Sequence, residues 1–134
     1  MTDDSSLDLE AFLLREREEV EKALERSLRY FSGHFPTSLA EPVRHAVMTG
    51  GKRLRPILCT VAYSTCGGNR GPMAHDLGVS LELIHAYSLM HDDLPCIDDA
   101  ELRRGRPTSH TLYGVEATVR AGLALIPTAS LQAL

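Results

Sequence analysis

The segment HDDLPCIDDAELRRGRPTSH, at residues 91–110, concentrates residue types that bind metal ions and phosphate. Four aspartates come first, as two adjacent pairs, and the arginines follow as a separate block. Carboxylate oxygens are hard ligands that suit Mg²⁺ better than zinc, and Mg²⁺ commonly completes its shell with water and substrate phosphates. Arginine makes bidentate, charge-assisted hydrogen bonds to phosphate oxygens. The segregated charges therefore predict a Mg²⁺ ion and a phosphorylated ligand.

Asp92 and Asp98 are six positions apart, which matters for whether both can reach one ion. On a regular helix they would lie roughly 120° apart around the axis and would not converge. Pro95 lies between them, and a proline inside a helix removes a backbone hydrogen bond, so the segment must kink or unwind. A negative cluster that merely met solvent at a helix C-terminus would be unfavourable against the helix dipole, which favours a ligand site.

A second basic cluster precedes this segment in GGKRLRP, at residues 50–56. Lys52, Arg53 and Arg55 lie just before or within the start of a helix that Pro56 is expected to open, and helix N-termini favour anions. Clusters of this kind are more often solvated surface when they stand alone. The aspartate-rich segment in the same chain favours a second phosphate site instead.

The elements that must position these residues are helical, because apolar residues recur at three, four or seven positions along nearly the whole chain. No strand alternation is evident, and RGRPTSHTLYG is expected to be a loop. The segment ILCTVAYSTC is apolar on most sides, which predicts a helix deep in a bundle. Leu131 and Leu134 give the last helix an apolar end without a cap, so the chain is expected to be cut short and to need a partner surface. Helices are expected at about 7–31, at about 42–48, from Pro56 through ILCTVAYSTC, at about 73–91, and from Val115 onward.

Composition sets the broad class of the protein. A chain of 134 residues with 43% hydrophobic residues and a formal net charge of −4 fits one globular domain and gives no basic surface for nucleic acid. The acidic start lacks the features of a secretory signal, and no apolar stretch is long enough to span a membrane, so a cytoplasmic location is expected. Three cysteines without a CxxC pair favour reduced thiols.

GGKRLRP, followed by LELIHAYSLMHDDLPCIDDAELRRGRPTSH, resembles the first half of a short-chain trans-prenyl diphosphate synthase of the polyprenyl synthetase family. The resemblance covers about residues 42–122 and is most like bacterial farnesyl or geranylgeranyl diphosphate synthases, with the aspartate-rich motif in its DDxxxxD form. It implies an all-α, isoprenoid-synthase-type helical bundle around a central cavity, of which residues 1–134 are a single partial domain, the front half.

The resemblance also implies an activity. It is the Mg²⁺-dependent condensation of isopentenyl diphosphate with an allylic diphosphate, dimethylallyl or geranyl, to give farnesyl diphosphate, in an enzyme that is a homodimer when full length. Two alternatives stay open, a geranylgeranyl diphosphate synthase and a truncated, non-catalytic subunit. The family's later aspartate-rich helix is absent from the sequence, and Leu123 in AGLAL stands where relatives often carry aspartate.

Individual roles follow by matching positions to the family motifs. Asp92 and Asp98 match the Mg²⁺ ligands and, with Arg103, the implied catalytic set; Arg103 matches the allylic diphosphate contact. His85 precedes Asp92 by seven residues, so both share a helix face, whereas His45, His75 and His91 are expected to be structural. The isopentenyl diphosphate site is matched by Lys52, Arg55, His85 and Arg104.

Two further expectations concern single positions. Tyr87 lies five residues before Asp92, where in the family a bulky residue accompanies short products, although a tyrosine on an apolar helix is as often ordinary core. A Mg²⁺ or zinc site of unrelated use, built from Asp92, His91, Cys96 and His110, is the remaining alternative, with irregular ligand spacing.

Overall fold

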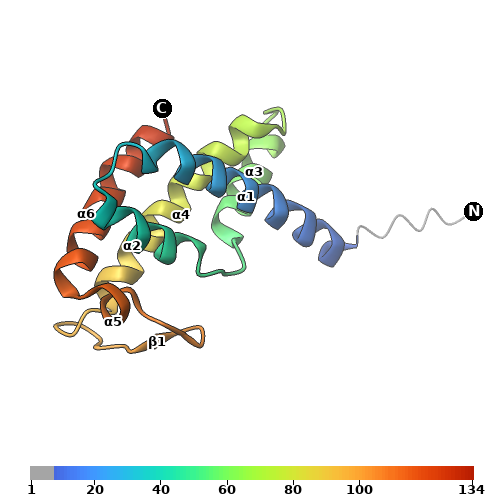
Figure 1. The fold of residues 1–134 in the computed structure, drawn as a ribbon. Helices are drawn as coiled ribbons and strands as arrows, with labels where there is room; N and C mark the ends of the chain where they lie inside the picture. Colours follow the sequence, from blue (N-terminus) through green and yellow to red (C-terminus); the bar gives the residue numbers. More distant parts are fainter. Residues whose placement is uncertain (1–7) are drawn as a thin grey trace, which may run out of the picture.

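The structure, a computed structural model, describes residues 8–134, so the expected start of the first helix at Leu7 lies outside the described residues. Helices dominate this part of the chain, and one short hairpin interrupts them near the aspartate-rich segment (Figure 1). The elements in chain order are α1 (Leu9–Ser32), α2 (Thr37–Met48), α3 (Leu54–Thr65), α4 (Pro72–Asp92), β1 (Leu102–Arg103), β2 (Arg106–Pro107), α5 (Ser109–Tyr113) and α6 (Val115–Gln132).

Helix α1 begins where its sequence provides a cap. The Asp8 carboxylate accepts hydrogen bonds from the backbone N–H groups of Glu10 and Ala11, at 3.1 and 3.2 Å, which satisfies two donors of the first turn. The helical period of apolar residues expected for this helix is confirmed over its second half, where side chains at helical spacing are buried. These are Val20, Leu24, Leu28 and Phe31.

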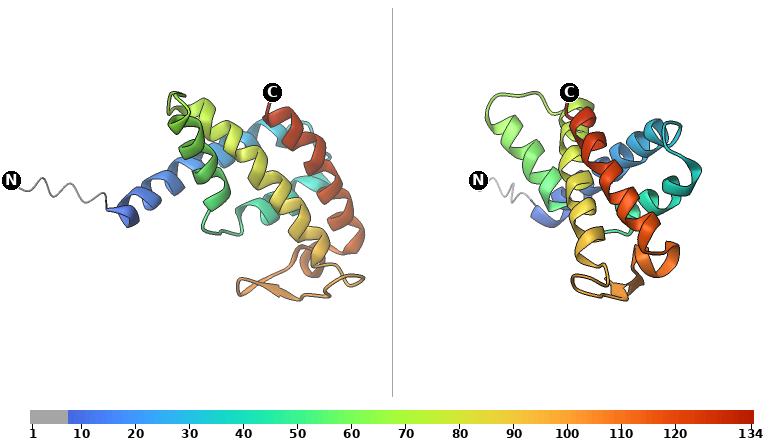
Figure 2. Two further views of the ribbon diagram at one scale, coloured as in Figure 1. Left: turned by 180° about the vertical axis from the view of Figure 1, so that it is seen from behind. Right: turned by 90° about the vertical axis from the view of Figure 1, so that its left-hand side faces the viewer.

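Helix α4 is the centre of the bundle and contacts α1, α3 and α6. It lies between α3 and α6 in both views of Figure 2. Val79 and Leu83 are fully buried on it. Gly78 allows the start of α3 to approach, because a Cβ atom at this position would lie 2.9 Å from the Cβ of Pro56.

Two expectations about the helices are wrong in detail. Helix α2 begins at Thr37, not near Pro42. Pro42 lies inside this helix on its buried face, which Val43 and Val47 continue by one turn. The segment expected deep in the bundle is only half covered, since α3 packs mainly on α4 and α1 and leaves Leu58 65% exposed.

The segment expected to be a loop without strands is a hairpin followed by α5. Strands β1 and β2 pair antiparallel, with Arg103 opposite Arg106, and the two residues between them have positive φ angles, 53° at Arg104 and 73° at Gly105. Positive φ at both central residues is the signature of a type I′ turn, whose twist matches that of the strands. The hairpin lies beside α5 at the end of the molecule where α4 terminates (Figure 1).

Candidate functional site

A pocket of about 560 Å³ lies where α1, the start of α3, α4 and the hairpin turn meet. Its lining includes every residue that the family match placed at an isopentenyl diphosphate site, although those residues come from three separate parts of the chain. The ligand of the pocket stays a prediction at this point. The matched residues are Lys52, Arg55, His85 and Arg104, and the pocket is completed by Arg17, Gly51, Arg53, Leu54 and Glu82.

The two glycines after α2 allow the hairpin to reach this pocket. Gly50 and Gly51 have φ angles of +94° and +141°, which residues with a side chain rarely adopt. The Arg104 guanidinium donates to the Gly50 carbonyl and packs against Gly51, where an added Cβ would lie 2.6 Å from Nη1 of Arg104. The GlyGly turn therefore holds Arg104 at the pocket as well as ending the helix.

Arg53 lies in the same basic cluster as Lys52 and Arg55 but is turned inward. Its backbone is left-handed, with φ of 54°, and only 4% of its side chain is exposed. Nη1 donates to Glu82 at 2.9 Å, Nε donates to Glu21 at 2.7 Å, and Nη2 donates to the Val47 carbonyl at 2.9 Å. Arg53 thus ties α1, α2, α3 and α4 together, and its charge is already satisfied by carboxylates.

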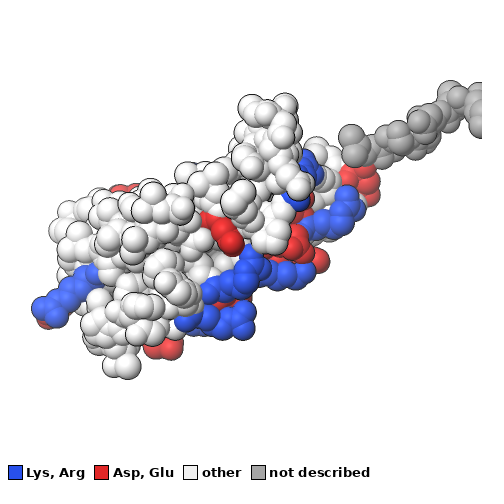
Figure 3. All heavy atoms as spheres, turned by 90° about the horizontal axis from the view of Figure 1, so that it is seen from above, with Lys and Arg blue, Asp and Glu red and all other residues white. Residues whose placement is uncertain are grey.

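The remaining cations of the pocket are not satisfied in this way. Within residues 8–134, Lys52, Arg55 and Arg104 form no ion pair with a carboxylate. Burial, and next the charge of Arg55, hold the pKa of His85 below its ordinary value, so its imidazole is neutral at neutral pH. Seen from above, lysine and arginine side chains gather along one edge of the molecule, interleaved with acidic ones (Figure 3). Uncompensated cations around one pocket favour an anionic ligand.

The aspartate-rich segment folds back on itself after α4. The helix ends at Asp92 instead of continuing through Pro95 with a kink, and the Asp98 backbone N–H donates to the Asp92 carbonyl at 2.9 Å. The two residues predicted as metal ligands are therefore brought together at the backbone, and both are exposed. The irregularity expected at Pro95 is a complete helix end.

The donor chemistry of Asp92 and Asp98 suits Mg²⁺, and their role as its ligands stays a prediction. They offer hard oxygen donors, and the structured part of the chain contains no group of three or more His, Cys, Asp and Glu side chains that could hold a metal by itself. Mg²⁺ is typically bound by one or two carboxylates, with water and substrate phosphates completing its shell.

The zinc alternative is wrong for the part of the chain that is described, because its proposed ligands are not grouped. The Nε2 atom of His91 lies 3.2 Å from the Val119 carbonyl oxygen, and that of His110 lies 2.8 Å from the Ala100 carbonyl oxygen. The Nε2 atom of each ring is thus occupied by a backbone carbonyl. His91 also fits its expected structural role.

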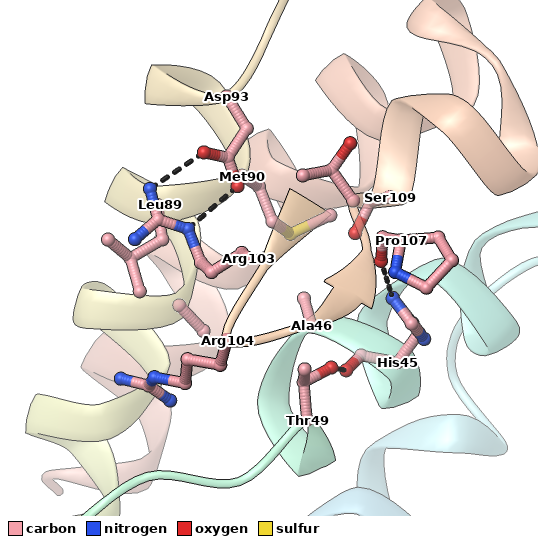
Figure 4. A pocket seen from close by; sticks show the side chains of 12 residues that line it. His45, Ala46, Thr49, Leu89, Met90, Asp93, Arg103, Arg104, Pro107 and Ser109 are labelled. Carbon is pink, nitrogen blue, oxygen red and sulfur yellow. Dashed lines mark hydrogen bonds and ion pairs between the residues drawn. The ribbon is translucent and has the colours of Figure 1, made fainter. Parts of the chain in front are cut away.

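Arg103 lines a small cavity of about 40 Å³, together with His45 and its neighbour Arg104 (Figure 4). Its Nε and Nη2 atoms donate to the two oxygens of the buried Asp93 carboxylate, at 2.8 and 2.7 Å. The hydrogen bonds to Asp93 raise the pKa of Arg103 further above its ordinary value. The bidentate fork expected for phosphate is therefore directed at Asp93, and only Nη1 keeps both of its N–H donors free for a ligand.

Tyr87 and Leu123 lie outside the large pocket. Tyr87 is the position predicted to limit product length, and Leu123 is the position that departs from the family. Tyr87 is half-buried, packs against the core and meets the His91 ring edge-on, with centroids 5.0 Å apart. Leu123 on α6 is 53% exposed.

Arg17 and Glu82 also line the pocket, and sequence reasoning missed both because nothing in α1 or α4 distinguishes them from surface charges.

Comparison with known proteins shows the family to which this chain belongs. Residues 36–133 match the family model described as polyprenyl synthetase. A geranylgeranyl pyrophosphate synthase of Arabidopsis thaliana, number 9 and chloroplastic by its name, is 42% identical over 122 residues, or 91% of this chain and 33% of that protein. A dimethylallyltranstransferase of Fischerella ambigua is 42% identical over 124 residues, or 92% of this chain and 35% of that protein.

A solved structure of a prenyltransferase is also similar to this chain in sequence and fold. The crystal structure of a geranyltranstransferase from Thermotoga maritima superposes with a TM-score of 0.78 at 34% identity, covering 89% of this chain and 44% of that one. The fold is therefore the all-α fold of isoprenoid synthases, as expected. The chain belongs to the polyprenyl synthetase family, and it spans about a third of the length of the curated relatives it matches. Among residues 8–134, no helix is long and apolar enough to cross a membrane.

Proposed function

We propose that the protein serves prenyl transfer, in which isopentenyl diphosphate condenses with an allylic diphosphate. The observation that carries the proposal is the convergence of Lys52, Arg55 and Arg104, none of them paired with a carboxylate in residues 8–134, around a single pocket. Cations that lack acidic partners can each give a charge-assisted hydrogen bond to a diphosphate oxygen. The names of the similar proteins, which refer to prenyl pyrophosphates and prenyl transfer, support the same reaction class.

The residues of this chain divide the work between two anions. Lys52, Arg55 and Arg104 hold the diphosphate of isopentenyl diphosphate, and the neutral His85 ring can donate one further N–H to it. Asp92 and Asp98 would hold Mg²⁺, which neutralises the charge of a departing allylic diphosphate when it is bound. In the reaction the allylic carbon–oxygen bond breaks and its electron pair leaves on diphosphate. The alkene carbon of isopentenyl diphosphate bonds to the allylic carbon, and the resulting cation gives a proton to the released diphosphate or to water.

Replacement of Lys52 or Arg55 by alanine should weaken the binding of isopentenyl diphosphate much more than the binding of geranyl diphosphate. A hydrogen bond to a charged group contributes about 1.5–3 kcal/mol, so each variant should lose roughly tenfold or more in affinity for the first ligand. Calorimetric titration with each diphosphate measures both losses. Lys22→Ala, which removes an exposed lysine of α1 outside the pocket, is the control, and equal losses for both ligands would contradict the assignment of this pocket.

Farnesyl diphosphate is the product that we propose, with geranylgeranyl diphosphate as the alternative. Tyr87→Ala in an active enzyme that contains this chain should shift the products toward longer prenyl chains, because it removes a half-buried ring from α4. Separation of the labelled products by chain length measures the shift, with Tyr63→Ala on α3 as a control of similar exposure. A product distribution like that of the parent would contradict the role of Tyr87. A parent that makes geranylgeranyl diphosphate would contradict the product assignment.

A non-catalytic role is the second candidate, and the exposed Leu123 in place of an expected aspartate favours it. Turnover of labelled isopentenyl diphosphate by a complete protein that contains this chain decides between the two, since a non-catalytic subunit would bind ligand without forming product. We further propose that residues 1–134 form part of one domain, that the complete enzyme is a homodimer, and that it works in the cytoplasm.

A further inference from the structure

Arg17 on α1 faces the same pocket as the cations of α3 and the hairpin, although no family motif includes it. The start of α3 contributes Lys52 and Arg55 to the lining, and the hairpin turn contributes Arg104. Arg17 adds a cation from a third stretch of chain, so the pocket has positive charge on the α1 side as well.

The arrangement around Glu21 explains why Arg17 is free to meet a ligand. Glu21 follows Arg17 by one helical turn and is the acidic neighbour with which an exposed arginine would ordinarily pair. Its carboxylate instead accepts two hydrogen bonds from Arg53, at 2.7 and 3.4 Å. Arg26, farther along the same helix, does have a partner in Asp76 at 3.1 Å. Arg17 forms no ion pair within the described part of the chain.

We infer that Arg17 is a further binding residue for the diphosphate group in this pocket. The inference rests on the proposed function, since it adds a contact to the same anion site. Four unpaired cations around about 560 Å³ repel one another in the empty pocket, and a diphosphate, which carries several negative charges, relieves that repulsion. Arg17 is exposed, so it closes on the ligand from the solvent side while Lys52 and Arg55 hold it at the helix start.

Titration of the protein with inorganic diphosphate tests the inference. Arg17→Ala should weaken diphosphate binding about tenfold, the lower end of the range for a charged hydrogen bond because the residue is exposed. Arg17→Lys should keep part of the affinity, since the charge remains while the fork is lost. Arg15→Ala removes an exposed arginine of the same helix that lies outside the pocket, and it should leave the affinity unchanged.

The same titration of Lys52→Ala separates this inference from the proposed function. Weakening by Lys52→Ala but not by Arg17→Ala overturns the role of Arg17 alone. Equal weakening by Arg17→Ala and Arg15→Ala also overturns it, because the effect would then be the general field of the helix. No weakening by Lys52→Ala overturns the diphosphate pocket itself. Thermal unfolding of each variant confirms that the comparison is made between folded proteins.

Discussion

Mg²⁺ should lose its effect on diphosphate binding when Asp92 and Asp98 are both replaced by asparagine. In the parent, saturating Mg²⁺ is expected to strengthen binding of geranyl diphosphate, the allylic ligand proposed for this ion, by about a hundredfold, because a bound divalent ion contributes several kcal/mol of charge stabilisation. Asparagine keeps the size and the backbone hydrogen bond between the two positions but removes both negative charges. Calorimetric titrations with Mg²⁺ and with a chelator give the ratio of affinities for each protein.

Asp99→Asn is the control for this experiment. Asp99 is exposed in the same loop and has a φ of +48°, a conformation that asparagine tolerates well. Its replacement should leave the Mg²⁺ effect intact. An undiminished effect in the Asp92 and Asp98 double variant, or the same loss in Asp99→Asn, would mean that these two carboxylates do not hold the ion.

Replacement of Arg53 by methionine should lower the free energy of unfolding by about 3–5 kcal/mol. The change removes the charge that pairs with Glu82, whose side chain is only 7% exposed, and leaves that carboxylate buried without its cation. An uncompensated buried charge is much more costly than the loss of the attraction alone. Urea unfolding followed by far-UV circular dichroism measures the difference.

Arg44→Met provides the matched comparison, because Arg44 also makes two hydrogen bonds to one glutamate, Glu25, but at the surface. Exposed pairs contribute only about 0–1 kcal/mol, so the free energy of unfolding of this variant should be close to that of the parent. Arg53→Met combined with Glu82→Gln should recover part of the lost stability. If Arg53→Met proved no more costly than Arg44→Met, the Arg53 network would not be what holds the four helices together.

Helices α1 and α4 could be predicted to within about two residues at the ends that are described, because their apolar residues recur with a clear helical period. The exposure of α3 could not be predicted, since a helix that is apolar on most sides gives no sign of which neighbours will cover it. The hairpin was missed for a different reason. Its strands have two residues each, too few to show alternation, and Arg104–Gly105 replaces the Asn-Gly or Asp-Gly that usually signals such a turn.

The site shows the same division between local and distant information. The motifs that include Lys52, Arg55, His85 and Arg104 pointed to residues that the structure does gather in one pocket. The inward turn of Arg53 left no trace in the sequence, because its partners Glu82 and Glu21 are 29 and 32 positions away. The pairing of Arg103 with Asp93 depends in the same way on how the intervening loop folds back.

Arg103 and Arg104 are neighbours in the chain, yet Arg103 donates to the Asp93 carboxylate and Arg104 donates to the Gly50 carbonyl beside the large pocket. Arg103 lies ten positions after Asp93, so the length of the intervening loop sets which arginine reaches which partner. One residue gained or lost in that loop would shift the register of β1, and in a strand such a shift turns every side chain to the other face. Over evolutionary time this loop should therefore tolerate exchange of its residues far better than insertion or deletion, and insertions should collect elsewhere, for example at the exposed turn around Gly67.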